Sequence, residues 1–193
     1  MMKPILALLA AAPLAACSFG AKPPPSFLQL SPASVVPVGQ ARSSASAPSI
    51  SILVPVIPQA LATARVPVQT TDTDVQYIND AQWVEPPQRL FARLVSDTVT
   101  ARTGRLVLSQ GQTIADPGAQ LAGELRNFGI DGRTREAVVT FDAALVRNAG
   151  KAVEKRRFEA RVPVAEISPA AAAPAINQAA NRVADELADW VGG

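Results

Sequence analysis

The sequence predicts an α+β domain of two layers, a largely antiparallel sheet with two amphipathic helices packed on one face. Three long strand candidates, residues 120–130, 136–147 and 151–164, follow one another with turn sequences between them. Strands joined by short turns pair as an antiparallel meander. Apolar residues recur at helical spacing in two further stretches, one on each side of these strands, and such stripes are typical of helices that cover a sheet.

An export signal is predicted over residues 1–16. Lys3 supplies its positive charge, an apolar run follows, and Leu14-Ala15-Ala16-Cys17 ends it. This ending resembles the bacterial lipoprotein signal, in which a peptidase cuts before the cysteine and the sulfur receives a diacylglycerol. The alternative is an ordinary signal peptide that contains a cysteine by chance, whereas a retained membrane span is disfavoured because it needs ~20 apolar residues. We therefore expect Cys17 to become the acylated first residue.

The composition argues against an enzyme and against a nucleic-acid-binding protein. The 193 residues include no histidine and one cysteine, so the commonest general base and the usual zinc ligands are missing. Lysine and arginine number 18 against 16 acidic residues, and no basic run is interleaved with aromatic residues, so we expect no nucleic-acid partner. We expect no catalytic residues, no metal and no cofactor other than the covalent lipid on Cys17.

Residues 17–49 are predicted to be an acylated, flexible tether with one short strand, and residues 50–193 a single globular α+β domain. Residues 18–25 contain three consecutive prolines, which favour an extended chain. The short strand covers residues 26–30. Residues 31–49 are rich in serine, alanine and proline, which is typical of a flexible segment, and an arm that becomes ordered on a partner is the alternative.

The first half of the domain predicts short β segments. Residues 50–58 are rich in β-branched side chains, but Pro55 and Pro58 restrict them to a sheet edge or to pieces broken by bulges. Residues 64–78 predict a hairpin around a polar turn of threonine and aspartate, and residues 105–108 predict a short strand.

The two helices are predicted over Pro86–Arg102 and roughly Pro174–Val191. Proline is tolerated in the first turn of a helix, and Gly104 provides a C-cap for the first one. The last helix has a second candidate start at Ser168-Pro169, and its polar face is acidic, so we expect it to pack on the sheet and not on an anionic membrane. The apolar stripes are Leu90, Phe91, Leu94, Val95 and Val99 in the first helix, and Ile176, Ala180, Val183, Leu187 and Val191 in the last.

Alternation with a period of two in the last long strand predicts one buried and one solvent-facing side of the sheet. Phe158, Ala160 and Val162 share one side, and charged residues share the other. Glutamates are interleaved with the basic residues of this region, so a solvated face of mixed charge is one interpretation, and binding of a partner is the other. The basic candidates for partner binding are Arg133, Arg135, Lys155 and Arg157.

Two aromatic residues, Tyr77 and Trp83, are further candidates for partner binding. They lie close together in the sequence, around a predicted turn, and aromatic rings anchor many protein interfaces. Packing in the core is the alternative, and the sequence leaves both interpretations open.

The order of these elements resembles that of the ABC-type transport auxiliary lipoproteins. The most specific part is the segment Tyr77 to Pro87, because family members often have a tyrosine followed by Trp-Ala-Glu-Pro, and this chain has Trp83-Val84-Glu85-Pro86. Phe27 and Leu28 stand where paired tyrosines are frequent. The resemblance implies a small α/β domain without catalytic residues, tethered by lipid at the outer membrane. There it would receive the periplasmic end of a mammalian-cell-entry (MCE) protein, whose inner-membrane end meets an ABC permease and an ATPase.

The function expected on this basis is that of a non-enzymatic adaptor of an MCE lipid transport system. The protein would be anchored on the periplasmic face of the outer membrane and would dock on the MCE protein, as several copies in a ring. A structural lipoprotein that assists outer-membrane or cell-wall assembly without any transporter is one alternative. A hydrolase that uses carboxylates alone is the other.

Replacing Cys17 with alanine should release the protein from the membrane or leave an uncleaved precursor, because no sulfur remains to carry the lipid. Fractionation of the cell envelope measures this, with the wild-type protein as the reference. An alanine variant that partitions with the outer membrane like the wild type would contradict the anchor.

Overall fold

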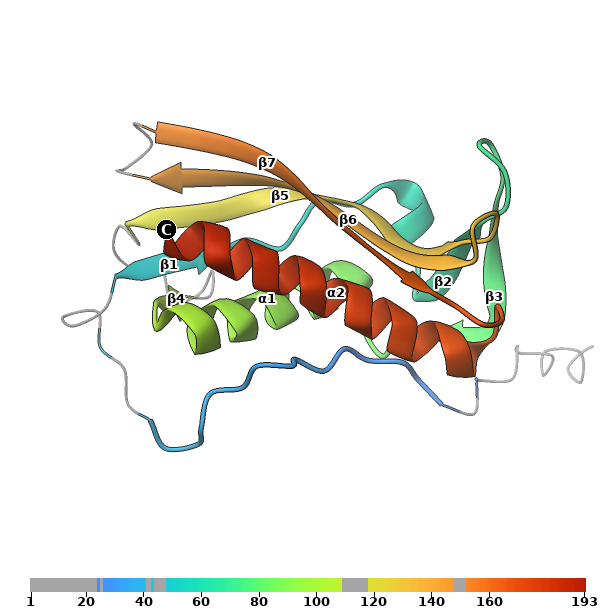
Figure 1. Cartoon of the computed structure of the whole chain (residues 1–193), viewed down its shortest axis with the longest axis horizontal. Helices are drawn as coiled ribbons and strands as arrows, with labels where there is room; N and C mark the ends of the chain where they lie inside the picture. Colours follow the sequence, from blue (N-terminus) through green and yellow to red (C-terminus); the bar gives the residue numbers. More distant parts are fainter. Residues whose placement is uncertain (1–23, 25, 41–42, 44–47, 109–117, 148–151) are drawn as a thin grey trace, which may run out of the picture.

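The computed structural model describes residues 24, 26–40, 43, 48–108, 118–147 and 152–193, so Cys17, the predicted signal and the predicted turn at 148–150 lie outside the described residues. Within these ranges, a seven-stranded sheet forms one layer, and both helices lie on one face of it as the second layer (Figure 1). The elements in chain order are β1 (Ser49–Ile52), the 3-10 helix η2 (Gln59–Leu61), β2 (Arg65–Gln69), β3 (Val75–Gln82), α1 (Pro87–Thr103), β4 (Leu106–Leu108), β5 (Ala119–Asp131), β6 (Glu136–Arg147), β7 (Ala152–Pro163) and α2 (Pro169–Gly192).

β5 organises the sheet because other strands pair along both of its edges. β6 pairs with it in antiparallel orientation over its whole length, from Ala119 opposite Arg147 to Asp131 opposite Glu136. On the other edge, β1 pairs with the beginning of β5 and β2 pairs with its end, both in parallel orientation. β7 continues the sheet beyond β6, β4 lies beyond β1, and β3 lies beyond β2.

The prediction of an α+β fold is confirmed, whereas the sheet is mixed and not largely antiparallel. The long meander β5–β6–β7 and the hairpin β2–β3 are antiparallel, as expected. β1 and β2 run parallel to β5, and β4 runs parallel to β1. These parallel pairings join strands that are distant in the sequence. Alternation of apolar residues within a strand shows which face is buried, but it does not show the direction of a distant neighbour.

Of the two expectations for residues 50–58, a sheet edge is wrong and separate β pieces are correct. β1 ends at Ile52, before Pro55, and lies between β4 and β5. Beyond it the chain continues along β5 through Val56, whose N–H donates to the carbonyl oxygen of Gly123 at 3.0 Å and whose carbonyl oxygen accepts from Leu125 at 2.9 Å. The prolines therefore occupy the connection after the strand, where a missing N–H removes no ladder hydrogen bond.

α1 begins and ends within one residue of the predicted helix. Gly104 follows it in the left-handed conformation, with a φ of 71°, and its N–H donates to the carbonyl oxygen of Thr100 at 3.2 Å. The predicted apolar stripe is the buried face of the helix: Leu90, Phe91, Leu94, Val95 and Val99.

α2 begins earlier than the start at Pro174 on which the predicted range was based. It starts at Pro169, the other candidate, and Pro174 lies inside the helix. Ser168 is the N-cap, and its Oγ accepts a hydrogen bond from the N–H of Ala171 at 3.4 Å. A serine cap followed by proline in the first turn satisfies the free N–H groups of a helix start without loss. Within the described ranges, neither helix is long and apolar enough to cross a membrane.

Aromatic rings fill the space between the helices and the sheet. Trp83 is 2% exposed, and its ring centroid lies 5.0 Å from that of Phe128. Phe91 in α1 contacts Phe128 and Phe141, with centroid distances of 6.4 and 5.3 Å. Gly123 leaves room for this cluster, because a Cβ there would come within 2.5 Å of the Phe141 ring. Core packing is therefore the correct interpretation of Trp83, and its ring is not available on the surface to anchor a partner.

The described part of the predicted tether is attached to the domain. Leu28 forms a single β-bridge with Trp83 in place of the predicted strand over residues 26–30. The N–H of Ser31 donates to Oδ1 of Asn177 at 2.9 Å, and the N–H of Ala33 donates to Oδ1 of Asn181 at 2.7 Å. We call residues 26–40 the arm, and Figure 1 shows it running along α2.

Replacing Leu94 with alanine should lower the free energy of unfolding by about 2–5 kcal/mol, through lost burial and the cavity left between α1 and its neighbours. Arg93→Ala is the matched control. Arg93 is exposed and makes a surface ion pair with Glu85, so its loss should change stability little. Chemical denaturation followed by circular dichroism measures both, and equal midpoints would contradict the orientation of α1.

Candidate functional site

Charged side chains cover the side of the meander that faces away from the helices. We call this side of β5, β6 and β7 the outer face. The alternation predicted for the last strand places Phe158 on the helix side and its charged neighbours on the outer face. The outer-face residues considered below are Arg126, Asn127, Val138, Thr140, Asp142, Lys155, Arg157, Glu159 and Arg161.

Asp142 is the centre of one ion-pair group on the outer face. Arg157, its direct neighbour across the β6–β7 pairing, donates from Nε to Oδ1 at 2.5 Å and from Nη2 to Oδ2 at 2.7 Å. Arg126 adds a longer contact, with Nη1 at 3.5 Å from Oδ2. The hydrogen bonds from Arg157 hold the pKa of the Asp142 carboxyl below its ordinary value.

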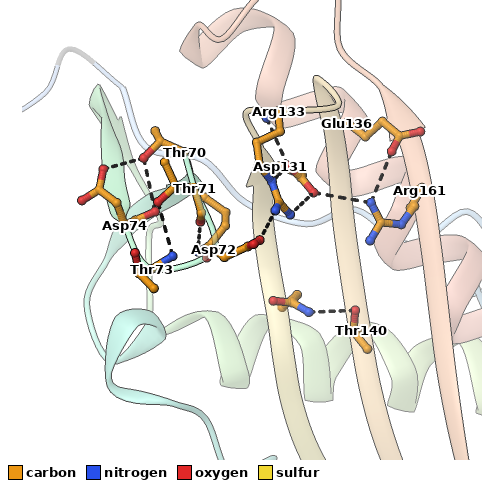
Figure 2. A network of polar contacts seen from close by, with 12 residues as sticks. Thr70, Thr71, Asp72, Thr73, Asp74, Asp131, Arg133, Glu136, Thr140 and Arg161 are labelled. Carbon is orange, nitrogen blue, oxygen red and sulfur yellow. Dashed lines mark hydrogen bonds and ion pairs between the residues drawn. The ribbon is translucent and has the colours of Figure 1, made fainter.

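Arg161 is the centre of a second group, and Figure 2 shows its contacts with Asp131 and Glu136. Its guanidinium lies 2.8 Å from Oε1 of Glu159, 3.3 Å from Oε2 of Glu136 and 3.7 Å from Oδ2 of Asp131. Thr140 donates to the other oxygen of Glu159 at 2.9 Å. Burial acts to raise the pKa of Glu159, but the hydrogen bonds from Arg161 and Thr140 outweigh it and the pKa is lowered.

Asp131 connects this group to two turns of the chain. The side chain of Arg133 donates to both of its carboxylate oxygens, from Nε and from Nη2 at 3.1 Å each, and the N–H of Arg133 also donates at 3.1 Å. Arg133 reaches further to Asp72 in the β2–β3 turn (Figure 2). Asp131 is 7% exposed, and the hydrogen bonds from Arg133 lower the pKa of its carboxyl.

Arg135 ties the β5–β6 turn to the segment before α2. It has a positive φ of 57°, its guanidinium donates to the carbonyl oxygen of Ala165, and its own carbonyl oxygen accepts from the N–H of Val164 at 2.8 Å. The role of Arg135 is therefore to hold two connections together. The β2–β3 turn, the β5–β6 turn and the start of α2 form one polar network at this end of the sheet.

A groove of about 440 Å³ opens on the outer face beside this network. Its walls come from η2, from the β2–β3 hairpin and from β5. Apolar and ionic residues both line the groove, and most of the ionic residues pair with one another, so the groove has room for an apolar side chain beside charges that are already compensated. The apolar lining includes Pro58, Leu61, Pro67, Gly129 and Val138, and the ionic lining consists of Asp72, Arg126, Asp131, Arg133 and Arg161.

Metal chemistry finds no support in the described ranges. No group of three or more histidine, cysteine, aspartate and glutamate side chains is placed there so that it could hold a metal ion. The carboxylates of the outer face are bound by arginines instead, as described above.

A family model for the ABC-type transport auxiliary lipoprotein component matches residues 28–188. The chain belongs to this family. The chain matches no curated protein sequence.

Two solved structures share the fold. The DUF330 protein XCC0632 from Xanthomonas campestris is 22% identical, with a TM-score of 0.67 over 87% of this chain and 91% of that one. An uncharacterized protein is 12% identical, with a TM-score of 0.65 over 86% of this chain and 99% of that one.

In this auxiliary lipoprotein, the residues predicted to bind a partner do not form one cluster. Arg157 and Lys155 are exposed on the outer face, Arg133 and Arg135 lie in the β5–β6 turn, and Trp83 is in the core. Tyr77 is half-buried. Its hydroxyl donates to the carbonyl oxygen of Ala60 at 3.2 Å, and the guanidinium carbon of Arg65 lies 4.5 Å from its ring centroid.

The most connected residues of the network, Asp131, Asp142 and Arg161, were not among the predicted site residues. The alternation of β7 contains the signal for Arg161, since it lies on the same side as Arg157 and Glu159. In the sequence, Asp131 belongs to one of the short turn sequences between the predicted long strands. Its link to Asp72 through Arg133 joins two turns that are 61 residues apart in the chain, and no local pattern predicts such a link.

Replacing Asp131 with asparagine should lower the free energy of unfolding of the auxiliary lipoprotein at neutral pH. It should also make this free energy fall less steeply as the pH is lowered. The pKa of Asp131 is lowered in the folded state, so its ionised form stabilises the fold above the unfolded-state pKa of about 3.9, and this contribution is lost as the pH falls through the lower folded pKa. Urea unfolding at steps between pH 7 and pH 2 measures the difference.

Asp80→Asn is the matched control for this variant. Asp80 is exposed and has a positive φ of 57°, which asparagine also adopts readily, so the control should unfold like the wild type. The free energies of unfolding of the wild type and of Asp131→Asn should approach each other below about pH 4. A difference that stays constant there would contradict the stabilising role of the Asp131 charge.

Proposed function

We propose that this chain is a non-enzymatic, lipid-anchored adaptor of an ABC-type lipid transport system, docked on an MCE-domain protein at the periplasmic face of the outer membrane. The observation that carries the proposal is the family match over residues 28–188, which begins a short distance after the predicted lipoprotein signal and Cys17. Through the MCE protein, the adaptor would be linked to an ABC permease and its ATPase. Several copies would surround the end of the MCE assembly.

The state of the carboxylates supports a binding role over a catalytic one. Arginine hydrogen bonds lower the pKa of Asp131, Asp142 and Glu159, so these groups stay ionised at neutral pH. A general acid or base works best with a pKa near the operating pH, which requires a shift in the opposite direction. This argues against the alternative of a hydrolase based on carboxylates alone.

The outer face is the surface through which the adaptor would dock. Neither α1 nor α2 covers it, and the antiparallel pairings and the polar network hold it rigid, so binding would order few side chains. Because its charges are paired with one another, a partner would be recognised by shape and hydrogen bonds more than by net charge. The groove would receive an apolar side chain of the partner, as pockets at the centre of interfaces do.

Co-expression with the candidate MCE protein, followed by purification through the lipoprotein, tests this proposal. A photocrosslinking residue at Lys155, which is exposed on the outer face, should capture the MCE protein. The same residue at Glu186, which is exposed on α2, is the matched control and should not capture it. An acylated, folded lipoprotein that never associates with an MCE protein would refute the transport role and favour a structural lipoprotein without a transporter.

A further inference from the structure

The arm is attached to the domain at a defined place, the end where α2 begins. The N–H of Leu28 donates to the carbonyl oxygen of Gln82 at 2.7 Å, and the carbonyl oxygen of Leu28 accepts from the N–H of Val84 at 2.8 Å. Farther along, the side-chain amide of the buried Asn181 donates to the carbonyl oxygen of Ser31 at 2.9 Å. From Leu28 onward the chain therefore belongs to the domain, and the tether to Cys17 ends there.

The length of this tether decides which end of the domain meets the membrane. Ten residues lie between Cys17 and Leu28, and even fully extended this stretch spans at most roughly 40 Å. α2 alone has 24 residues, which corresponds to a length of about 36 Å. For the opposite end of the domain to touch the membrane, the tether would have to be stretched nearly straight along the whole molecule. The end that carries Leu28 is thus the one held beside the lipid.

Three large apolar side chains are exposed at this end. Phe27 and Val84 are each 52% exposed, and they flank the hydrogen bonds made by Leu28. Ile167 is 42% exposed, directly before the N-cap of α2, and its Cδ1 lies 3.7 Å from where a Cβ on Gly132 would be. We call these three residues the anchor-side patch. Phe27 and Val84 lie next to the two residues of one β-bridge, whereas Ile167 lies against the β5–β6 turn, so the three share an end of the domain. Exposed apolar groups at one end are candidates for a contact site.

Charge does not provide the attraction at this end. Asp80 and Glu166 are exposed on neighbouring segments, and the exposed Arg133 is already paired with Asp72 and Asp131, so this end offers no excess of positive charge to anionic headgroups. The contact has to be apolar, and it can be weak, because a lipid anchor within about 40 Å keeps the membrane at a high effective concentration.

We infer that the anchor-side patch, Phe27, Val84 and Ile167, rests on the lipid surface that holds the anchor, so that α2 stands away from the membrane. The outer face then lies on the side of the molecule, where it is accessible to a protein partner. This inference rests on the acylation of Cys17 in the proposed function, but it does not require an MCE protein.

The test uses the acylated protein in vesicles of phosphatidylethanolamine and phosphatidylglycerol, without any transporter. Because acylation occupies Cys17, the only cysteine, a new cysteine can be labelled selectively with a nitrobenzoxadiazole dye. Val84→Cys places the dye in the patch. Val153→Cys is the matched control, since Val153 is 58% exposed at the start of β7, opposite Val146 and far from the arm's attachment. Lipids with nitroxide groups on their acyl chains quench only dyes that reach the membrane.

The dye at position 84 should be quenched several-fold more strongly than the dye at position 153. Equal quenching at the two positions, or stronger quenching at position 153, would overturn the proposed orientation. Quenching at neither position would mean that the domain does not touch the membrane, which would also overturn it. Mass spectrometry of the purified protein shows whether Cys17 is acylated, and an unmodified cysteine would overturn the anchor and this inference together. If position 84 is quenched more strongly but the protein binds no MCE partner, the orientation is supported and only the adaptor role is refuted.

Discussion

The double pairing of β5 is the constraint on which the rest of the structure depends. Both edges of this strand are hydrogen-bonded to other strands, while its apolar side chains must all face the helices. A β-bulge between Leu125 and Asn127 makes this possible, because the extra residue brings Leu125 and Phe128 to the same face although three positions separate them. Phe128 then contacts Trp83 and Phe91, which fixes the end of β3 and α1 against the sheet.

The opposite side of the same strands carries a set of paired charges. Every carboxylate with a lowered pKa on this side is hydrogen-bonded to an arginine or a threonine. Such pairs keep their charge at neutral pH and hold the neighbouring strands and turns in place. The outer face, on which we propose that a partner docks, is a rigid surface with a groove. The helices pack on the other side of its strands.

The arm connects the fold to its place in the cell envelope. The family model begins at residue 28, and Leu28 is also where hydrogen bonds first join the arm to the domain. Asn177 and Asn181 then hold the arm on α2 through its backbone atoms, so the contact depends little on which side chains the arm carries. A segment rich in serine, alanine and proline can therefore be ordered without an apolar pattern of its own.

Local patterns in the sequence determined the meander, the β2–β3 hairpin and both helices, because periodicity, turn residues and caps act over a few neighbouring residues. The export signal, outside the described residues, stays a prediction from the sequence. The tertiary structure alone decided the parallel pairings of β1 and β2, the central place of β1, the burial of Trp83 and the start of α2 at Pro169. It also decided the site, since Asp131 reaches Asp72 through Arg133, and Ser31 reaches Asn177. Each of these contacts joins groups far apart in the chain, and its energy depends on packing and hydrogen-bond geometry that no short stretch of sequence contains.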